Sequence, residues 1–252
     1  RMPLSMGVSC LLAVLFVIRR IEALPADEKT RFFSWALFKR IAVIAVPSIL
    51  QQSFISVGNL FIQYMVNGYG SSIVAGYSAA IKLNTFAITC FTTIGNGMSS
   101  FTAQNIGADK PERIRKGFRS SLFFSLGTAA VFFLLFFILS EPLLSLFMNG
   151  DSSRLAMDTG VDFLRIASPF YFIVSAKLVS DGVLRGAGLM KKFMIATFTD
   201  LVLRVALAEV LSRTALGTTG IWISWPIGWT IAAALSIVFY ATVRWEKVYT
   251  AA

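Results

Sequence analysis

Six apolar segments, each long enough to cross a lipid bilayer as a helix, constrain the fold of this chain more than any other feature. A helix needs about 20 residues to cross the hydrocarbon core, and a helix satisfies all of its backbone hydrogen bonds internally. The segments are 41–66, 73–106, 120–139, 161–184, 193–211 and 221–243, and a shorter run at 4–18 precedes them. The sequence therefore predicts an all-α, polytopic transmembrane helical bundle with six full spans and a short N-terminal partial span.

The composition agrees with a membrane protein and argues against redox or metal chemistry. Hydrophobic residues make up 56% of the chain and charged residues 14%, whereas charged residues are about a quarter of a soluble domain. Histidine is absent, which removes the commonest general base and metal ligand. The two cysteines, Cys10 and Cys90, lie in apolar runs without the spacing of a metal site or a disulfide framework. We expect no cofactor, no metal site and no enzymatic activity.

The net charge of +10 is distributed in a way that indicates membrane topology. Because topology explains the basic residues, we do not expect nucleic acid as a partner. The numbers of Lys and Arg residues in successive connectors, ending with the tail, are 6, 0, 5, 1, 3, 1 and 2. The basic segments are 19–40, 109–119, 185–192 and the tail from Arg244. Because cytoplasmic loops carry the excess of Lys and Arg, we predict a multi-pass protein of the cell membrane with a cytoplasmic C-terminus.

The same rule places the start of the run at 4–18 outside the cell. A polytopic protein that begins in this way resembles the second part of a longer one. We therefore expect residues 1–40 to be the end of a preceding helix with a cytoplasmic linker, and residues 41–252 to be a six-helix lobe. A preceding membrane lobe is then an expected partner.

Two of the predicted spans carry polar side chains on one face. In segment 41–66 these are Gln52, Ser56, Asn59 and Gln63, and in segment 73–106 they are Lys82, Thr85, Thr89, Thr93 and Asn96. The stripe in the first span indicates either hydrogen bonding between helices or the lining of a cavity. Lys82 lies about ten residues inside its span, so it faces a wet interior or forms a buried pair with a carboxylate.

Two later spans carry charges. Lys177, Asp181 and Arg185 form a ladder four residues apart that can neutralise itself pairwise, and this arrangement serves structure or transport. Asp200 and Arg204 are spaced to pair on one helix face, as a structural ion pair or as a gating element.

Small and aromatic residues complete the pattern of these spans. Gly182 and Gly186 have the spacing of close helix contacts. We expect most of the aromatic residues in and after the last span to act as anchors at the membrane interface; they are Trp222, Trp225, Trp229, Tyr240 and Trp245. Segment 120–139 is apolar all round, so we expect a peripheral, lipid-facing span.

Motifs in four parts of the chain carry a family resemblance. They are AGYSAAIKLNTF and GMSSFTAQNIGADKPERIRKGF in 75–118, LRGAG at 184–188, TFTDLVLRVALAEVL at 197–211 and GIWISWPIGWTIAAALSIVFY at 220–240. In this order they resemble the C-terminal lobe of MATE (multidrug and toxic compound extrusion) transporters. The resemblance implies two pseudo-symmetric six-helix lobes around a central cavity. It further implies a secondary active antiporter that exports small organic, often cationic compounds by alternating access, with Na⁺ or H⁺ as the coupling ion.

Some members of that family hold the coupling cation with acidic residues in the C-terminal lobe. The matching places here fall near Ile55 and Ile173, which are apolar. Other members place the essential aspartate in the N-terminal lobe, so the resemblance leaves both the coupling ion and its site open. For the substrate or ion pathway we predict Gln52, Asn59, Gln63, Lys82, Asn96, Lys177, Asp181, Asp200 and Arg204.

Three other functions compete with drug export. A flippase of lipid-linked oligosaccharides or other lipids, from the same superfamily, fits Lys82 and Lys177, because these lysines suit an anionic head group. An intramembrane enzyme built on Asp181 and Asp200 is disfavoured, since the basic residue four positions from each aspartate lowers the pKa of a carboxyl group. A passive channel has no selectivity-filter sequence to support it.

Overall fold

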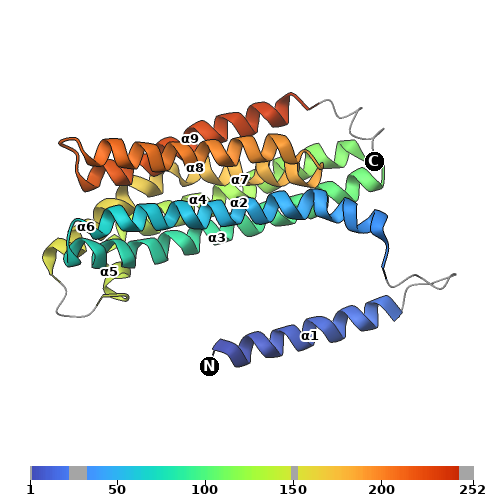
Figure 1. The fold of residues 1–252 in the computed structure, drawn as a ribbon, viewed down its shortest axis with the longest axis horizontal. Coiled ribbons are helices and arrows are strands. Elements are labelled where there is room, and N and C mark those ends of the chain that lie inside the picture. The colour runs from blue at the N-terminus through green and yellow to red at the C-terminus, as the bar shows by residue number, and fades with distance from the viewer. Residues whose placement is uncertain (1, 23–32, 149–152, 244–252) are drawn as a thin grey trace. The chain divides into compact units, whose positions relative to one another are not determined.

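The computed structural model describes residues 2–22, 33–148 and 153–243, and all regular elements within these ranges are helices (Figure 1). The elements are α1 (Met2–Glu22), α2 (Trp35–Asn67), α3 (Ser71–Gly107), α4 (Pro111–Ile138), α5 (Ser140–Ser145), α6 (Arg154–Ala167), the 3₁₀ turn η1 (Ser168–Phe170), α7 (Tyr171–Gly186), α8 (Met190–Ser212) and α9 (Thr218–Ala241). The all-α prediction is confirmed. The tail from Arg244, counted above as a basic segment, lies outside the described residues, as does part of segment 19–40.

The chain divides into two compact units, Arg1–Ala42 and Val43–Ala252. The first unit contains α1, which extends the expected run at 4–18 to a helix of 21 residues. The second unit contains most of α2 and all of the later helices, and its long helices run side by side (Figure 1). The assignment of residues 1–40 to the end of another lobe stays a prediction.

Five helical stretches in the described ranges are long and apolar enough to cross a membrane: α2, α3, α4, the combined stretch Arg154–Gly186 and α9. The sixth predicted span lies in α8, which is long enough at 23 residues. Asp200, Arg204 and Glu209 place three charges within ten residues in the middle of α8. Its length therefore agrees with a span, and its charges need a neighbouring helix to cover them.

Glycines bring α3 and α7 into backbone contact. A Cβ atom on Gly182 would lie 2.2 Å from the carbonyl oxygen of Gly95, and one on Gly186 would lie 2.3 Å from that of Ser99. Only residues without a Cβ allow this approach, so the prediction of close helix contact at Gly182 and Gly186 is confirmed. Near the other end of α3, a Cβ on Gly76 would lie 2.1 Å from the carbonyl oxygen of Ala156 in α6. The helix α3 is thus packed tightly against α6 and against α7, on both sides of the η1 turn that contains Pro169.

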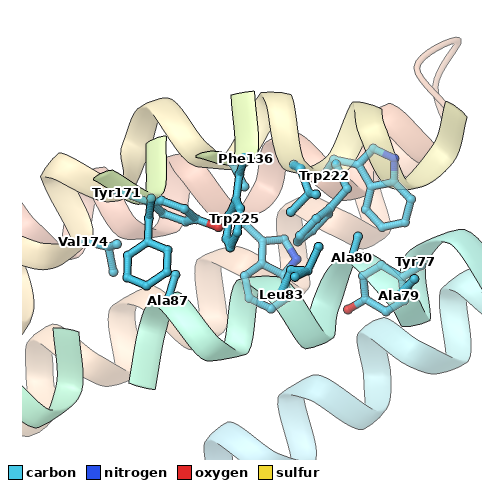
Figure 2. Close-up of a cluster of buried hydrophobic side chains, with 14 of the residues drawn as sticks. Tyr77, Ala79, Ala80, Leu83, Ala87, Phe136, Tyr171, Val174, Trp222 and Trp225 are labelled. Carbon is cyan, nitrogen blue, oxygen red and sulfur yellow. The ribbon is translucent and has the colours of Figure 1, made fainter. Parts of the chain in front are cut away.

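An aromatic core joins α3, α6 and α9. The ring of Tyr77 stacks on that of Trp222 at 5.1 Å, and Phe163 meets Trp222 edge-on at 5.4 Å. In Figure 2 the side chains of Tyr77, Trp222 and Trp225 lie in one layer between the helices. The exposed fractions of Trp222, Trp225 and Trp229 are 1%, 5% and 3%. For these three tryptophans the prediction of interfacial anchors is therefore wrong, because α6, α7 and α8 pack around α9 and the rings fill the core instead. Trp245 lies outside the described residues.

The helix α4 lies at the periphery of the bundle, with one face exposed and the other packed against the core. Phe123 and Phe124 are 82% and 66% exposed, as expected for a lipid-facing span. Phe132 and Phe136 are buried and contact the core, where the Phe136 ring lies edge-on to that of Tyr171. Because segment 120–139 is apolar all round, its sequence did not show that one face of the helix is packed and the other is open.

Candidate functional site

The predicted stripe on α2 is exposed in this chain. Gln52 and Asn59 are exposed, and Gln63 is half-buried and donates a hydrogen bond from Nε2 to Oδ1 of Asn67 at 2.9 Å. The hydroxyl of Ser56 donates to the backbone carbonyl of Gln52 at 3.0 Å. No other described helix satisfies these side chains, so the interpretation as packing within this lobe is not supported.

The predicted stripe on α3 is exposed as well. Lys82, Thr85, Thr89, Thr93 and Asn96 all lie on the open side of the helix. Lys82 forms no ion pair with any described residue, and its Nζ lies 5.9 Å from the centre of the Phe147 ring. The alternative of a buried carboxylate partner is therefore not found in the described part of the chain. A cavity-facing role for Lys82 stays a prediction.

The first rung of the ladder on α7 is a buried ion pair. Nζ of Lys177 donates to Oδ2 of Asp181 at 2.7 Å, and the two residues are only 3% and 4% exposed. The second carboxylate oxygen of Asp181 accepts a hydrogen bond from Ser236 of α9 at 2.6 Å. Both charges are thus neutralised, and α7 is joined to α9 at this level.

The second rung is not formed. Arg185 is expected to pair with Asp181, but its guanidinium donates to Asn96 and, at 3.4 Å, to the hydroxyl of Ser99. The glycine contacts explain this difference, because they bring α3 within reach of the Arg185 side chain. Asn96 therefore belongs both to the exposed stripe of α3 and to the contact with α7.

Asp200 and Arg204 do not form the expected pair. The guanidinium carbon of Arg204 lies 4.4 Å from the centre of the Trp225 ring, and Arg204 is 6% exposed. Among the described residues, Oδ1 of Asp200 and Nε of Arg204 are buried without a hydrogen-bond partner. Asp200 instead packs against Gly228, where a Cβ atom would lie 2.7 Å from its Oδ1. Stacking on Trp225 and the close approach of α9 at Gly228 hold the two side chains in this arrangement.

The structure brings four of the nine predicted residues together and leaves the other five apart from them, four exposed and Gln63 half-buried. Lys177, Asp181, Asp200 and Arg204 form what we call the charge cluster, between α7, α8 and α9, with Asp200 and Arg204 in electrostatic range of Lys177. Two cations and two carboxylates make its formal charge zero. Gln52, Asn59, Gln63, Lys82 and Asn96 lie on what we call the polar faces of α2 and α3. Ile55 and Ile173, near which the family resemblance leads us to expect the acidic residues of some transporters, are half-buried and have apolar side chains.

Three polar or aromatic contacts in the bundle were not predicted from the sequence, and two of them are made by residues of the charge cluster. Ser236 lies in an apolar run and has no neighbour in sequence that marks it as the partner of Asp181. Trp225 was predicted to lie at the membrane interface, but its ring contacts the guanidinium group of Arg204. Asn84 is buried and accepts a hydrogen bond from the Tyr171 hydroxyl at 3.0 Å, a pairing 87 residues apart that the sequence does not signal.

Known proteins resemble this chain along most of its length. A model of the family described as MatE matches residues 47–210. The probable multidrug resistance protein YpnP of Bacillus subtilis (strain 168) is 24% identical over 250 residues, which cover 98% of this chain and 55% of that protein. The FAD transporter of Shewanella oneidensis is 28% identical over 129 residues, 51% of this chain and 28% of that protein.

The fold agrees with solved structures. An outward-facing multidrug resistance MATE family transporter of the MOP superfamily superposes with a TM-score of 0.84 at 21% identity, over 98% of this chain and 55% of that one. The chain thus spans about half the length of the proteins that it matches over nearly its whole extent.

Proposed function

We propose, because the chain belongs to the MatE family of membrane transporters, that it forms the C-terminal lobe of an efflux transporter. Members of this family are multi-pass membrane transporters, so the prediction that the chain is not an enzyme is confirmed. The proposed transporter exports organic, often cationic compounds in exchange for Na⁺ or H⁺ by alternating access. A second lobe, about as long as this chain, completes it.

The observation that carries this proposal is the exposure of the polar faces of α2 and α3. A charged side chain at the centre of a membrane helix costs about 3 kcal/mol on insertion scales. Lys82 and the polar residues that follow it on α3 are exposed on a helix that is otherwise apolar enough to cross lipid. The cost is avoided if water and a second lobe surround the Lys82 side chain, and it remains if lipid surrounds it. The proposed substrate path therefore runs along these faces, with Gln52, Asn59 and Lys82 nearest to the substrate.

The proposed orientation places the C-terminal end of α9 in the cytoplasm. The basic connectors 109–119 and 185–192 lie at this end, since the ring of Phe118 stacks on Tyr240 at 4.1 Å and Lys192 lies 5.7 Å from the Phe239 ring. An excess of Lys and Arg at one end supports a cytoplasmic location for it.

The coupling ion is proposed to be Na⁺ or H⁺. In the described ranges, Asp181 and the Oδ1 atom of Asp200 are the carboxylate groups buried inside the bundle, and the second lobe is the other proposed source of a coupling carboxylate. Proteoliposomes with an imposed Na⁺ gradient at equal pH, and others with an imposed pH gradient without Na⁺, distinguish the two ions. If neither gradient drives efflux, antiport is ruled out.

The test of the substrate path uses the complete transporter in vesicles loaded with a fluorescent organic cation. Lys82→Ala is expected to change the efflux rate by tenfold or more, while the matched surface variant Lys116→Ala leaves it unchanged. Both variants are checked for expression and thermal unfolding. Unaltered efflux by Lys82→Ala removes this residue from the proposed path.

A lipid or other anionic cargo is the second candidate function. An ammonium group without a carboxylate partner among the described residues, on an exposed face, suits an anionic group better than a cation. The relative named as an FAD transporter points the same way, because FAD carries a pyrophosphate. Translocation of a head-group-labelled lipid, without efflux of the organic cation, would favour this candidate.

A further inference from the structure

The hollow between the beginning of α4 and the end of α9 combines two cations with an aromatic floor. Its volume is about 330 Å³, and its lining consists of Arg115, Phe118, Arg119, Tyr240 and Ala241. The rings of Phe118 and Tyr240 stack at 4.1 Å with 24° between their planes and pack on a small apolar cluster around Met98 and Ile114. The floor is therefore fixed by the core of the bundle.

The two guanidinium groups are available for a ligand. Arg115 and Arg119 are exposed and lie one helical turn apart, so both reach the same hollow. Neither forms an ion pair with another residue of the described ranges. Guanidinium groups bind phosphate through paired hydrogen bonds, which makes a phosphate group the best match for this pair.

An apolar ridge of α4 continues from these arginines toward the middle of the membrane. Phe123, Gly127 and Val131 follow Arg119 at intervals of four residues, so they are neighbours along one row of the helix surface. All three are exposed, and Phe123 and Val131 are 82% and 56% exposed. A ligand with a phosphate at one end and a hydrocarbon chain at the other matches this succession of cations, aromatic rings and apolar surface.

We propose that this hollow binds the head group of an anionic phospholipid, whose acyl chain lies along the ridge from Phe123 to Val131. Its location in the cytoplasmic leaflet rests on the orientation proposed above, while the binding itself does not depend on transport. Anionic lipids are attracted to basic residues near that leaflet by about 1 kcal/mol per Lys or Arg. The pair of arginines is therefore worth about thirtyfold in affinity for phosphatidylglycerol over phosphatidylcholine.

The experiment measures lipid retention by native mass spectrometry of the purified full-length protein. The protein is titrated with dioleoyl phosphatidylglycerol or dioleoyl phosphatidylcholine. The double variant Arg115→Gln/Arg119→Gln is expected to lose about thirtyfold in affinity for phosphatidylglycerol and less for phosphatidylcholine, whose phosphate charge is offset by its own choline cation. The control Arg113→Gln/Lys116→Gln removes the same charge from residues of the same connector that do not line the hollow, and it retains the affinity.

A second pair of variants tests the ridge. Phe123→Gln is expected to weaken phosphatidylglycerol binding, whereas Phe124→Gln, one residue away on a neighbouring strip of the same helix, leaves it unchanged. The variant Arg115→Lys/Arg119→Lys keeps both charges and is the control for folding. Thermal unfolding of the variants in lipid-free detergent also reports any loss of folding.

Three outcomes would overturn the proposal. An equal loss in both double glutamine variants shows only general attraction to basic loops. Displacement of the lipid by millimolar inorganic phosphate shows a site for free anions. Equal affinity for both lipids shows that the head-group charge is not recognised. Since the readout is binding and not efflux, each outcome can be told apart from a failure of the proposed transport function.

Discussion

The polar faces of α2 and α3 and the charge cluster between α7, α8 and α9 contain similar side chains in opposite surroundings. In the charge cluster, Lys177 and Asp181 are buried and bonded to each other at 2.7 Å. On the polar face of α3, Lys82 is exposed and has no carboxylate partner among the described residues. The ion pair neutralises Lys177 inside the bundle, whereas Lys82 is exposed to a ligand or a second lobe in the proposed transporter. Burial, and not residue type, separates the surroundings of the two lysines.

The largest expected effect comes from breaking the buried pair. Asp181→Ala leaves Lys177 charged and unpaired in the bundle, which is expected to destabilise the fold by about 3–5 kcal/mol. Glu209→Ala, which breaks the exposed pair with Arg213, is expected to cost less than about 1 kcal/mol. Thermal unfolding of both variants in one detergent measures the difference. Similar losses would contradict the structural role of the buried pair.

The same pair allows a sharper test. Lys177→Met combined with Asp181→Leu removes both charges, and the double variant is expected to recover most of the stability lost in Asp181→Ala. If the double variant unfolds as early as the single one, the loss comes from altered packing or from Ser236 and not from an uncompensated charge.

The next effect concerns the close contact between α3 and α7. Gly182→Ala places a methyl group against the backbone of α3 and is expected to cost about 2 kcal/mol. Gly97→Ala is the control, because a Cβ there meets no atom within 4 Å, and it is expected to be neutral or stabilising by up to about 1 kcal/mol. Unfolding midpoints give the comparison. A tolerant Gly182 would mean that α3 and α7 can separate without loss.

A smaller effect is expected from Arg204→Lys. The substitution keeps the charge and loses the planar group that lies over Trp225, at a cost of about 1 kcal/mol. Arg213→Lys, at an exposed position, serves as the control. If Arg204→Lys unfolds at the same temperature as the parent protein, stacking does not hold Arg204 in place.

Substitutions on the polar faces are expected to have the smallest effect on stability. They are also expected to show most clearly which residues are accessible to a water-soluble reagent. In a background of Cys10→Ser and Cys90→Ser, the variants Asn59→Cys and Thr89→Cys are expected to change stability by less than about 0.5 kcal/mol. A water-soluble maleimide is expected to label both rapidly in vesicles, while Phe124→Cys on the lipid-facing side of α4 reacts slowly. Equal rates at Thr89 and Phe124 would place the α3 face against lipid.

Periodicity and length predicted the helices and both groups of polar residues, because these properties belong to each helix separately. The spacing of Gly182 and Gly186 predicted the close contact of α7 with another helix for the same reason. Burial depends on which helices meet, so the sequence could not tell that Trp222 is in the core while Lys82 is open. The partner of Arg185 was missed because Asn96 lies on a different helix, 89 residues earlier.

The contact between α3 and α7 limits how this lobe can change shape. With backbone atoms touching at Gly95 and Gly182, and with the Arg185 guanidinium bonded to Asn96, neither helix can slide along the other without a steric clash or a broken bond. The two helices are therefore expected to move together. Because α3 also contacts α6 at Gly76, a bend at the η1 turn would have to break that contact, so a displacement of α3 is expected to carry the Lys177–Asp181 bond on α7 with it.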